Sequence, residues 1–394
     1  MLDLSAAFFF FQLFYNLPSF TYFIWNSSIK ADIPRIPILY QPLQVTNLKM
    51  VNSAPDLELY ARITVCQTNF SESVTYNWKI LPDEGHGYQS PSLNCSFVFQ
   101  TTHYSSLRIE IEVQAQNGAI LARGDRHIQL EKTWIAVLGD SFVSGEGNPE
   151  ETSPAVLWQN EECHRSRKSF GYQVANKLAV QSPNKTFQLS FLACSGASTN
   201  ELTDGYRSQL ARIERISSEG KRGPNIVILT IGANDIGFSD LLQALSHRFL
   251  TLGYFESRFL DLSFQLDRVA SRLSSMNVGK VVLSLYYDIT RNENGEVDAS
   301  CGAFGKVKSI NLAQAEKKFF KKLNDLLKRK AERHGWIVVD SIPALFSTRG
   351  VCSSRSLVYS PEESVRKMFS VRGSFHPTEE GHRLVAEELL KLIH

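Results

Sequence analysis

The residues of this chain that could perform chemistry lie in four short, widely separated segments. The first contains Ser141, which follows the apolar run Ile135–Leu138 and the pair Gly139-Asp140. This pattern is typical of a strand that ends in a tight turn, where a hydroxyl is exposed and backbone N–H groups stay free for a ligand. Because a serine at such a position is more often a cap, its interpretation depends on the other three segments.

Those segments supply the groups that acyl transfer requires: a base for the nucleophile and donors for the oxyanion. They are Ala193-Cys-Ser-Gly196, Gly232-Ala-Asn-Asp235 and Phe375-His-Pro377. We expect Ser141 to be the nucleophile and His376, largely neutral at pH 7, to act as base and then acid. The backbone N–H groups of Ser141 and Gly196 and the side-chain amide of Asn234 would bind the oxyanion. Taken singly, Gly196 could be a turn glycine, Asn234 a helix cap and His376 an ordinary exposed histidine.

The elements that position these residues can be predicted from about residue 131 onward. Five short apolar runs alternate there with segments of helical periodicity; they are Trp134–Leu138, Phe187–Leu192, Ile226–Ile231, Lys280–Leu285 and Trp336–Asp340. This alternation predicts an α/β fold, a three-layer α/β/α doubly wound parallel five-stranded sheet of the flavodoxin-like type. Ligands bind beyond the carboxyl ends of such strands. Ser141, Gly196 and Asn234 follow the first, second and third runs.

Residues 30–130 show a different, alternating pattern of apolar and polar positions. The segments Leu59–Cys66, Cys95–Phe99 and Leu107–Val113 read as half-buried antiparallel strands, and Gln116-Asn-Gly118 as a hairpin turn. We therefore expect a small β-sandwich accessory domain before a catalytic domain at 131–394. No ligand of the accessory domain can be named.

Several features point to export. Residues 1–25 are expected to form a signal peptide or an N-terminal anchor, because Ala6–Trp25 is mostly apolar, although a buried core element is the alternative. We therefore expect a secreted protein, or one in the lumen of the secretory pathway. The net charge of +2 gives no reason to expect a nucleic-acid partner. Four glycosylation sequons are present, at Asn26, Asn69, Asn94 and Asn184.

The six cysteines are even in number, as a disulfide framework requires, and allow 15 pairings. They fall into three sequence-local pairs, Cys66/Cys95, Cys163/Cys194 and Cys301/Cys352. Free thiols are the alternative, and a metal site is disfavoured because neither a CxxC motif nor a Cys/His cluster occurs.

A basic segment, Lys317–Arg333, carries eight Lys or Arg residues along an apolar stripe of helical spacing. The simpler interpretation is a helix with a solvated outer face. Transient contact with an anionic membrane surface is the alternative.

The four catalytic segments, in this order, resemble the SGNH (GDSL-type) hydrolase family over roughly residues 131–394. Further details are similar to its secreted bacterial lipase and esterase branch: Gly139-Asp-Ser-X-X-X-Gly-Glu-Gly147, Cys163-His-Arg-Ser166, Ala193-Cys-Ser-Gly-Ala197 and Phe375-His-Pro-Thr-X-X-Gly-His382. The resemblance implies a serine esterase or lipase without cofactor or metal. In that branch the cysteines equivalent to Cys163 and Cys194 are paired.

The chain departs from the family at one position. The family usually carries an Asp three residues before the catalytic histidine, and here that residue is Gly373. We expect the carbonyl of Gly373 to orient the ring of His376 in a Ser-His dyad, with Asp340 as the fallback orienting residue.

The expected substrate is a small-molecule or lipid ester. The loops Tyr286–Gly305 and Phe346–Arg372 should shape the pocket wall, and their apolar content favours an acyl chain. A carbohydrate acetylesterase and an inactive secreted binding or scaffolding protein remain the alternatives.

Overall fold

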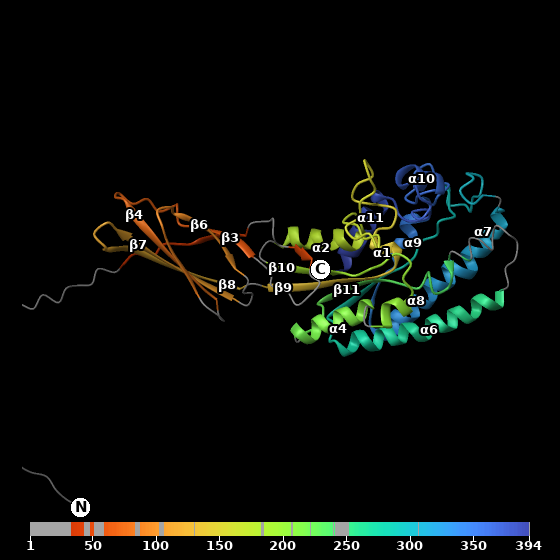
Figure 1. Ribbon diagram of the computed structural model, residues 1–394, viewed down its shortest axis with the longest axis horizontal. Helices are drawn as coiled ribbons and strands as arrows, with labels where there is room; N and C mark the ends of the chain where they lie inside the picture. The colour runs from red at the N-terminus through yellow and green to blue at the C-terminus, as the bar shows by residue number, and fades with distance from the viewer. Residues whose placement is uncertain are drawn as a thin grey trace, which may run out of the picture.

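The structure is a computed structural model of the chain, shown in Figure 1. It describes residues 33–42, 48–50, 59–82, 87–101, 106–129, 131–182, 185–205, 208–220, 222–238, 240, 252–305 and 307–393. The expected signal peptide or anchor at 1–25 and the sequons at Asn26 and Asn184 lie outside the described residues. The sequons at Asn69 and Asn94 are described, and both asparagines are exposed.

Two antiparallel sheets precede the α/β part of the chain. One has the order β1-β3-β6, with strands Leu39–Pro42, Leu59–Thr64 and Ser96–Thr101. The other has the order β5-β4-β7-β8, with strands Tyr88–Ser92, Val74–Pro82, Ser106–Ala115 and Ile120–Gln129. Alternate residues of β7 are buried, and they pack with Ile63 and Trp78 in a core to which both sheets contribute. The predicted small β-sandwich is confirmed.

A parallel sheet forms the centre of the α/β part, in the order β13-β12-β11-β9-β10-β2. The strands are β9 Glu131–Gly139, β10 Lys185–Phe191, β11 Ile226–Thr230, β12 Lys280–Ser284 and β13 Ile337–Val339, with β2 Leu48–Met50 at the edge. The five predicted strands and their doubly wound order are confirmed. The edge strand β2 was not expected, because three residues are too few to show a periodic pattern.

Helices cover both faces of the parallel sheet (Figure 1). On one face lie α2 Phe170–Gln181 and α11 Glu379–Ile393. On the other lie α4 Gln209–Gly220, α6 Leu252–Ser275 and α8 Lys322–His334. Shorter segments are α1 Ser141–Ser144, α3 Thr199–Thr203, α7 Ser309–Ala315, α9 Ser341–Phe346, α10 Pro361–Met368 and the π-helix η2 Glu316–Lys321.

The basic segment lies on η2 and α8, and its apolar stripe packs into the core. Several of its cations are paired with acids: Lys330 contacts Asp267 at 2.7 Å and Lys328 contacts Asp340 at 2.6 Å. These contacts fit an ordinary outer helix face. Among the described residues, no helix combines the length and the apolar character that crossing a membrane would require.

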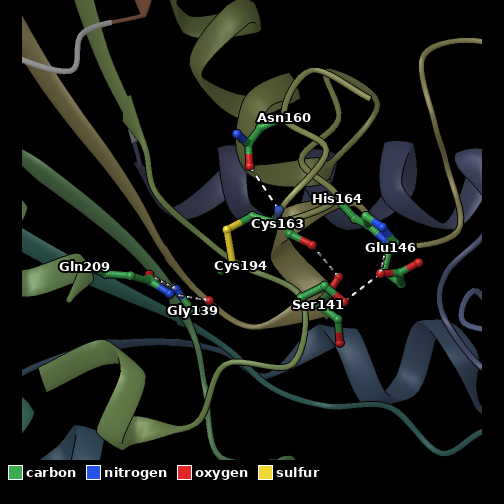
Figure 2. The surroundings of a disulfide bond; sticks show 10 residues. Gly139, Ser141, Glu146, Asn160, Cys163, His164, Cys194 and Gln209 are labelled. Carbon is green, nitrogen blue, oxygen red and sulfur yellow. Dashed lines mark hydrogen bonds and ion pairs between the residues drawn. A yellow bond between two sulfur atoms is a disulfide. The ribbon is translucent and has the colours of Figure 1, made fainter. Parts of the chain in front are cut away.

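All three expected disulfides are present: Cys66–Cys95, Cys163–Cys194 and Cys301–Cys352. The first joins two neighbouring strands of the β-sandwich, since Cys66 follows β3 and Cys95 precedes β6. The second joins two loops beside Ser141 (Figure 2). The third connects the two long loops that follow β12 and α9.

Candidate active site

The turn that carries Ser141 is built by the residues before it. Strand β9 ends at Gly139, whose φ of 129° favours glycine and where a Cβ would lie 1.9 Å from the carbonyl oxygen of Thr230. Asp140 then caps α1, because its carboxylate accepts from the N–H of Phe142 at 3.0 Å. Ser141 is the first helical residue, so its own N–H has no acceptor within the helix.

Asp140 also connects three strand ends. Its carboxylate accepts a hydrogen bond from the hydroxyl of Tyr286, which follows β12. The same hydroxyl accepts from the N–H of Ala233, after β11, at 3.1 Å. Complete burial raises the pKa of Asp140 to about 7, although the bond from Tyr286 opposes the rise. The serine turn is therefore held by a buried hydrogen-bond network rather than by loop residues alone.

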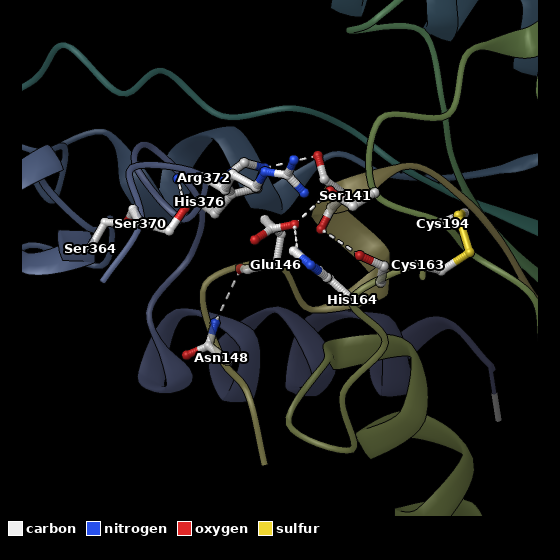
Figure 3. Close-up of polar contacts among 12 residues, drawn as sticks. Ser141, Glu146, Asn148, Cys163, His164, Cys194, Ser364, Ser370, Arg372 and His376 are labelled. Atoms are coloured by element: carbon white, nitrogen blue, oxygen red, sulfur yellow. Dashed lines mark hydrogen bonds and ion pairs between the residues drawn. A yellow bond between two sulfur atoms is a disulfide. The ribbon is translucent and has the colours of Figure 1, made fainter. Parts of the chain in front are cut away.

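His376 faces the nucleophile. Its Nε2 lies 2.8 Å from Oγ of Ser141, and its Nδ1 lies 3.0 Å from the carbonyl oxygen of Ser374. With a proton on Nδ1, the ring donates to this carbonyl and Nε2 can accept the serine proton. Figure 3 shows Ser141 and His376 on facing segments.

The two orienting residues expected from the sequence differ in where they lie. The carbonyl of Gly373 lies beside the ring and, with those of Ser374 and Arg372, raises the pKa of His376, although the 3.0 Å contact of Nδ1 is with Ser374. The chain turns sharply here, with Phe375 at φ 66°, and sequence does not fix which carbonyl such a turn aims at the ring. Asp340 is wrong as the fallback, because its side chain is 67% exposed and pairs with Lys328.

Burial lowers the pKa of His376, and the negative charge of Glu146 partly opposes this change. The imidazole is therefore neutral at physiological pH and ready to accept a proton. Its ring packs against Phe142, with centroids 5.2 Å apart.

The expected oxyanion donors converge on the same place. Asn234 donates one amide N–H to the carbonyl of Ala197 at 2.9 Å, which fixes the side chain and leaves its second N–H free. The N–H of Gly196 has no acceptor among the described residues. Gly196 has φ 84°, and no atom lies within 4 Å of a Cβ built there. A ligand can therefore approach this backbone closely.

A cavity of about 610 Å³ brings the four predicted residues together, since Ser141, Gly196, Asn234 and His376 all line it. Its remaining wall is largely apolar, with one cation; the side chains include Phe142, Phe238, Val371, Phe375 and Arg372. Of the two long loops, the second lines the cavity directly, and the first supports it through Phe304, which stacks on Phe375 at 5.4 Å. Within the described part of the chain, no three His, Cys, Asp or Glu side chains are grouped as a metal ion would need.

One buried carboxylate beside the site was missed by sequence reasoning. Glu146 is 1% exposed, and its Oε2 lies 2.5 Å from Oγ of Ser195 and 2.8 Å from Nδ1 of His164. Burial opposes ionisation of Glu146, but the bond from His164, the charge of His376 and the bond from Ser195 outweigh it and lower the pKa. The bond to Glu146 in turn raises the pKa of His164. The only sequence signal was the presence of Glu146 and His164 in two of the family-like motifs.

The Cys163–Cys194 disulfide explains how this network is assembled (Figure 2). The N–H of Ser195 donates to the carbonyl of Cys163 at 3.1 Å, so the two joined loops are also paired through their backbones. On the other side, the amide of Gln209 donates to and accepts from the backbone of Gly139, both at 2.8 Å. The loop bearing Gly196 is thereby fixed relative to the serine turn.

Known proteins are similar to this chain in sequence and in fold. The model of the GDSL-like lipase/acylhydrolase family matches residues 137–384. Lipase 1 of Streptomyces coelicolor is 27% identical over 251 residues, covering 62% of this chain and 80% of the relative. A lipase of Streptomyces rimosus is 26% identical over 265 residues, covering 64% and 84%. The crystal structure of the extracellular lipase from S. rimosus superposes with a TM-score of 0.50 and 23% identity, over 66% of this chain and 100% of that one.

Proposed function

Because the chain belongs to the GDSL-like lipase/acylhydrolase family and is a carboxylic ester hydrolase, we propose that it cleaves acyl esters through a covalent intermediate on Ser141. The observation that carries this proposal is the 2.8 Å contact between Oγ of Ser141 and Nε2 of His376. A nucleophile and its base must be within this reach for the proton to transfer as the serine attacks.

The reaction has two halves. Ser141 attacks the ester carbonyl while His376 takes its proton, and His376 then protonates the departing alcohol to leave an acyl-enzyme. Water, deprotonated by the same histidine, attacks the acyl-enzyme and releases the acid. The carbonyl of Ser374 holds the ring in the required tautomer, so the proposed machinery is a Ser-His dyad.

The negative charge on the tetrahedral intermediates requires fixed donors. We assign this role to the N–H groups of Ser141 and Gly196 and to the free amide N–H of Asn234. The wall that contains Phe142, Phe238 and Phe375 supports an acyl-lipid substrate over a sugar acetate.

The same reasoning extends to where the protein acts. Three disulfides and the exposed sequons at Asn69 and Asn94 support a secreted protein, or one in the lumen of the secretory pathway. The division into an accessory domain at 30–130 and a catalytic domain at 131–394 is part of this proposal.

The test is hydrolysis of nitrophenyl esters from acetyl to palmitoyl. We expect the wild type to prefer the longer chains and Ser141→Ala and His376→Ala to lose activity. Matched controls are Ser218→Ala and His127→Ala, which change exposed residues that do not line the cavity. A folded wild type that cleaves no ester of the panel would favour the alternative, an inactive binding protein.

A further inference from the structure

A second cavity, of about 950 Å³, adjoins the candidate active site. It shares Ser195 and Gly196 with the first cavity, so a group bound in it lies next to the proposed oxyanion donors. The Cys163–Cys194 disulfide and Gln209, both drawn in Figure 2, are part of its wall.

Of the three arginines that line this cavity, Arg165 and Arg212 form no ion pair with a described residue. Nε and Nη1 of Arg165 are buried and have no hydrogen-bond partner. Arg212, on α4, lies close enough for its charge to act on Arg165: burial first, and then this like charge, lower the pKa of Arg165 to about 10. Adjacent like charges are unfavourable, and a bound anion would offset them.

The acidic residues of the same cavity do not neutralise this pair. Glu162 partly offsets the charge on Arg165 but makes no ion pair with it in the described part of the chain. Asp204 is paired with an arginine of α6 at 2.8 Å. Glu201 accepts from the residue that caps α3. Neither guanidinium group is therefore neutralised by an ion pair with a described residue.

We propose that Arg165 and Arg212 form a subsite for a phosphate group carried by the ester substrate. Each guanidinium presents its donors as a planar fork, and a phosphate has enough acceptor oxygens for two forks, whereas a carboxylate can fill only one. The shared wall at Ser195 and Gly196 assigns the phosphate to the molecule whose ester is cleaved. The inference rests on the proposed function and narrows its substrate to phosphorylated acyl esters; the phosphate remains intact during the reaction.

The test compares two esters with the same acyl chain, octanoyl glycerol phosphate and octanoyl glycerol, by the release of octanoate. We expect the wild type to favour the phosphorylated ester. Arg165→Gln and Arg212→Gln should each lower kcat/KM for it by about tenfold to a hundredfold, the usual effect of losing a charge-assisted hydrogen bond. For octanoyl glycerol, kcat/KM of both variants should stay within about twofold of the wild-type value. Arg167→Gln, at a neighbouring exposed residue outside the cavity, is the matched control.

Calorimetric titration with inorganic phosphate is the second arm, and it remains informative if Arg165→Gln does not fold. Suppose that the wild type binds phosphate, that Arg212→Gln abolishes this binding, and that the two esters are cleaved equally. This result would support the subsite but assign it to free phosphate. Equal cleavage with no phosphate binding to the wild type would overturn the proposal and leave the esterase function intact. If neither ester is cleaved and Ser141 is unreactive toward a fluorophosphonate, the proposed function itself fails.

Discussion

Replacing Asn234 by alanine separates the proposed catalytic role of this side chain from its structural one. One amide N–H of Asn234 is bonded to the carbonyl of Ala197, and the second is the proposed oxyanion donor. Alanine removes both. We therefore expect two effects of different kinds, one on turnover and one on stability.

The two effects have different magnitudes. Loss of one oxyanion donor typically lowers kcat about 100- to 1000-fold, or about 2.7–4 kcal/mol of transition-state stabilisation, with KM little changed. The lost bond leaves the carbonyl of Ala197, a buried residue, without its donor, which should lower the free energy of unfolding by about 1–3 kcal/mol.

The assay is steady-state hydrolysis of a nitrophenyl ester at a temperature where urea titration shows the variant to be folded. The control is Asn225→Ala, at the opposite end of β11, where the side chain accepts from the N–H of Trp134 at 2.8 Å. Asn225→Ala should lose similar stability and keep its kcat. The reasoning is refuted if Asn234→Ala retains kcat within about threefold of wild type, or if the control loses as much activity.

Four further predictions concern single side chains in the site and around it. Because Asp340 is exposed, Asp340→Asn should change kcat less than about twofold. Loss of a triad aspartate would instead lower kcat about 10⁴-fold. The profile of kcat/KM against pH should fall on the acid side as His376 gains a proton, with a midpoint below about 6.5 because burial lowers its pKa. Glu146→Gln should move that midpoint lower still, since it removes the charge that raises the pKa of His376; a flat profile would count against His376 as the base. Tyr286→Phe removes a donor from buried Asp140 and should lower the free energy of unfolding by about 2–5 kcal/mol in urea titrations, and an unchanged midpoint would contradict this network.

The sequence was sufficient for the parts of the site that depend on topology. Ser141, Gly196 and Asn234 each follow a short, mainly apolar run, and such runs become neighbouring parallel strands whose carboxyl ends share one edge. Their meeting in one cavity could therefore be expected without knowledge of any contact.

The parts that depend on backbone angles and loop packing could not be predicted in this way. Nδ1 of His376 lies 3.0 Å from the carbonyl of Ser374, and the carbonyls of Gly373 and Arg372 also act on the ring, an arrangement set by the turn at Phe375. Glu146 stands between Gly145 and Gly147, and this pattern does not indicate what its carboxylate contacts. Its contacts arise only because the paired loops bring Ser195 beside it.

Covalent labelling with a fluorophosphonate, located by mass spectrometry of the resulting peptides, tests the central claim most directly. The account predicts one label per chain, on Ser141, lost in Ser141→Ala and greatly slowed in His376→Ala. Labelling of another residue, or no labelling of the folded wild type, would contradict it.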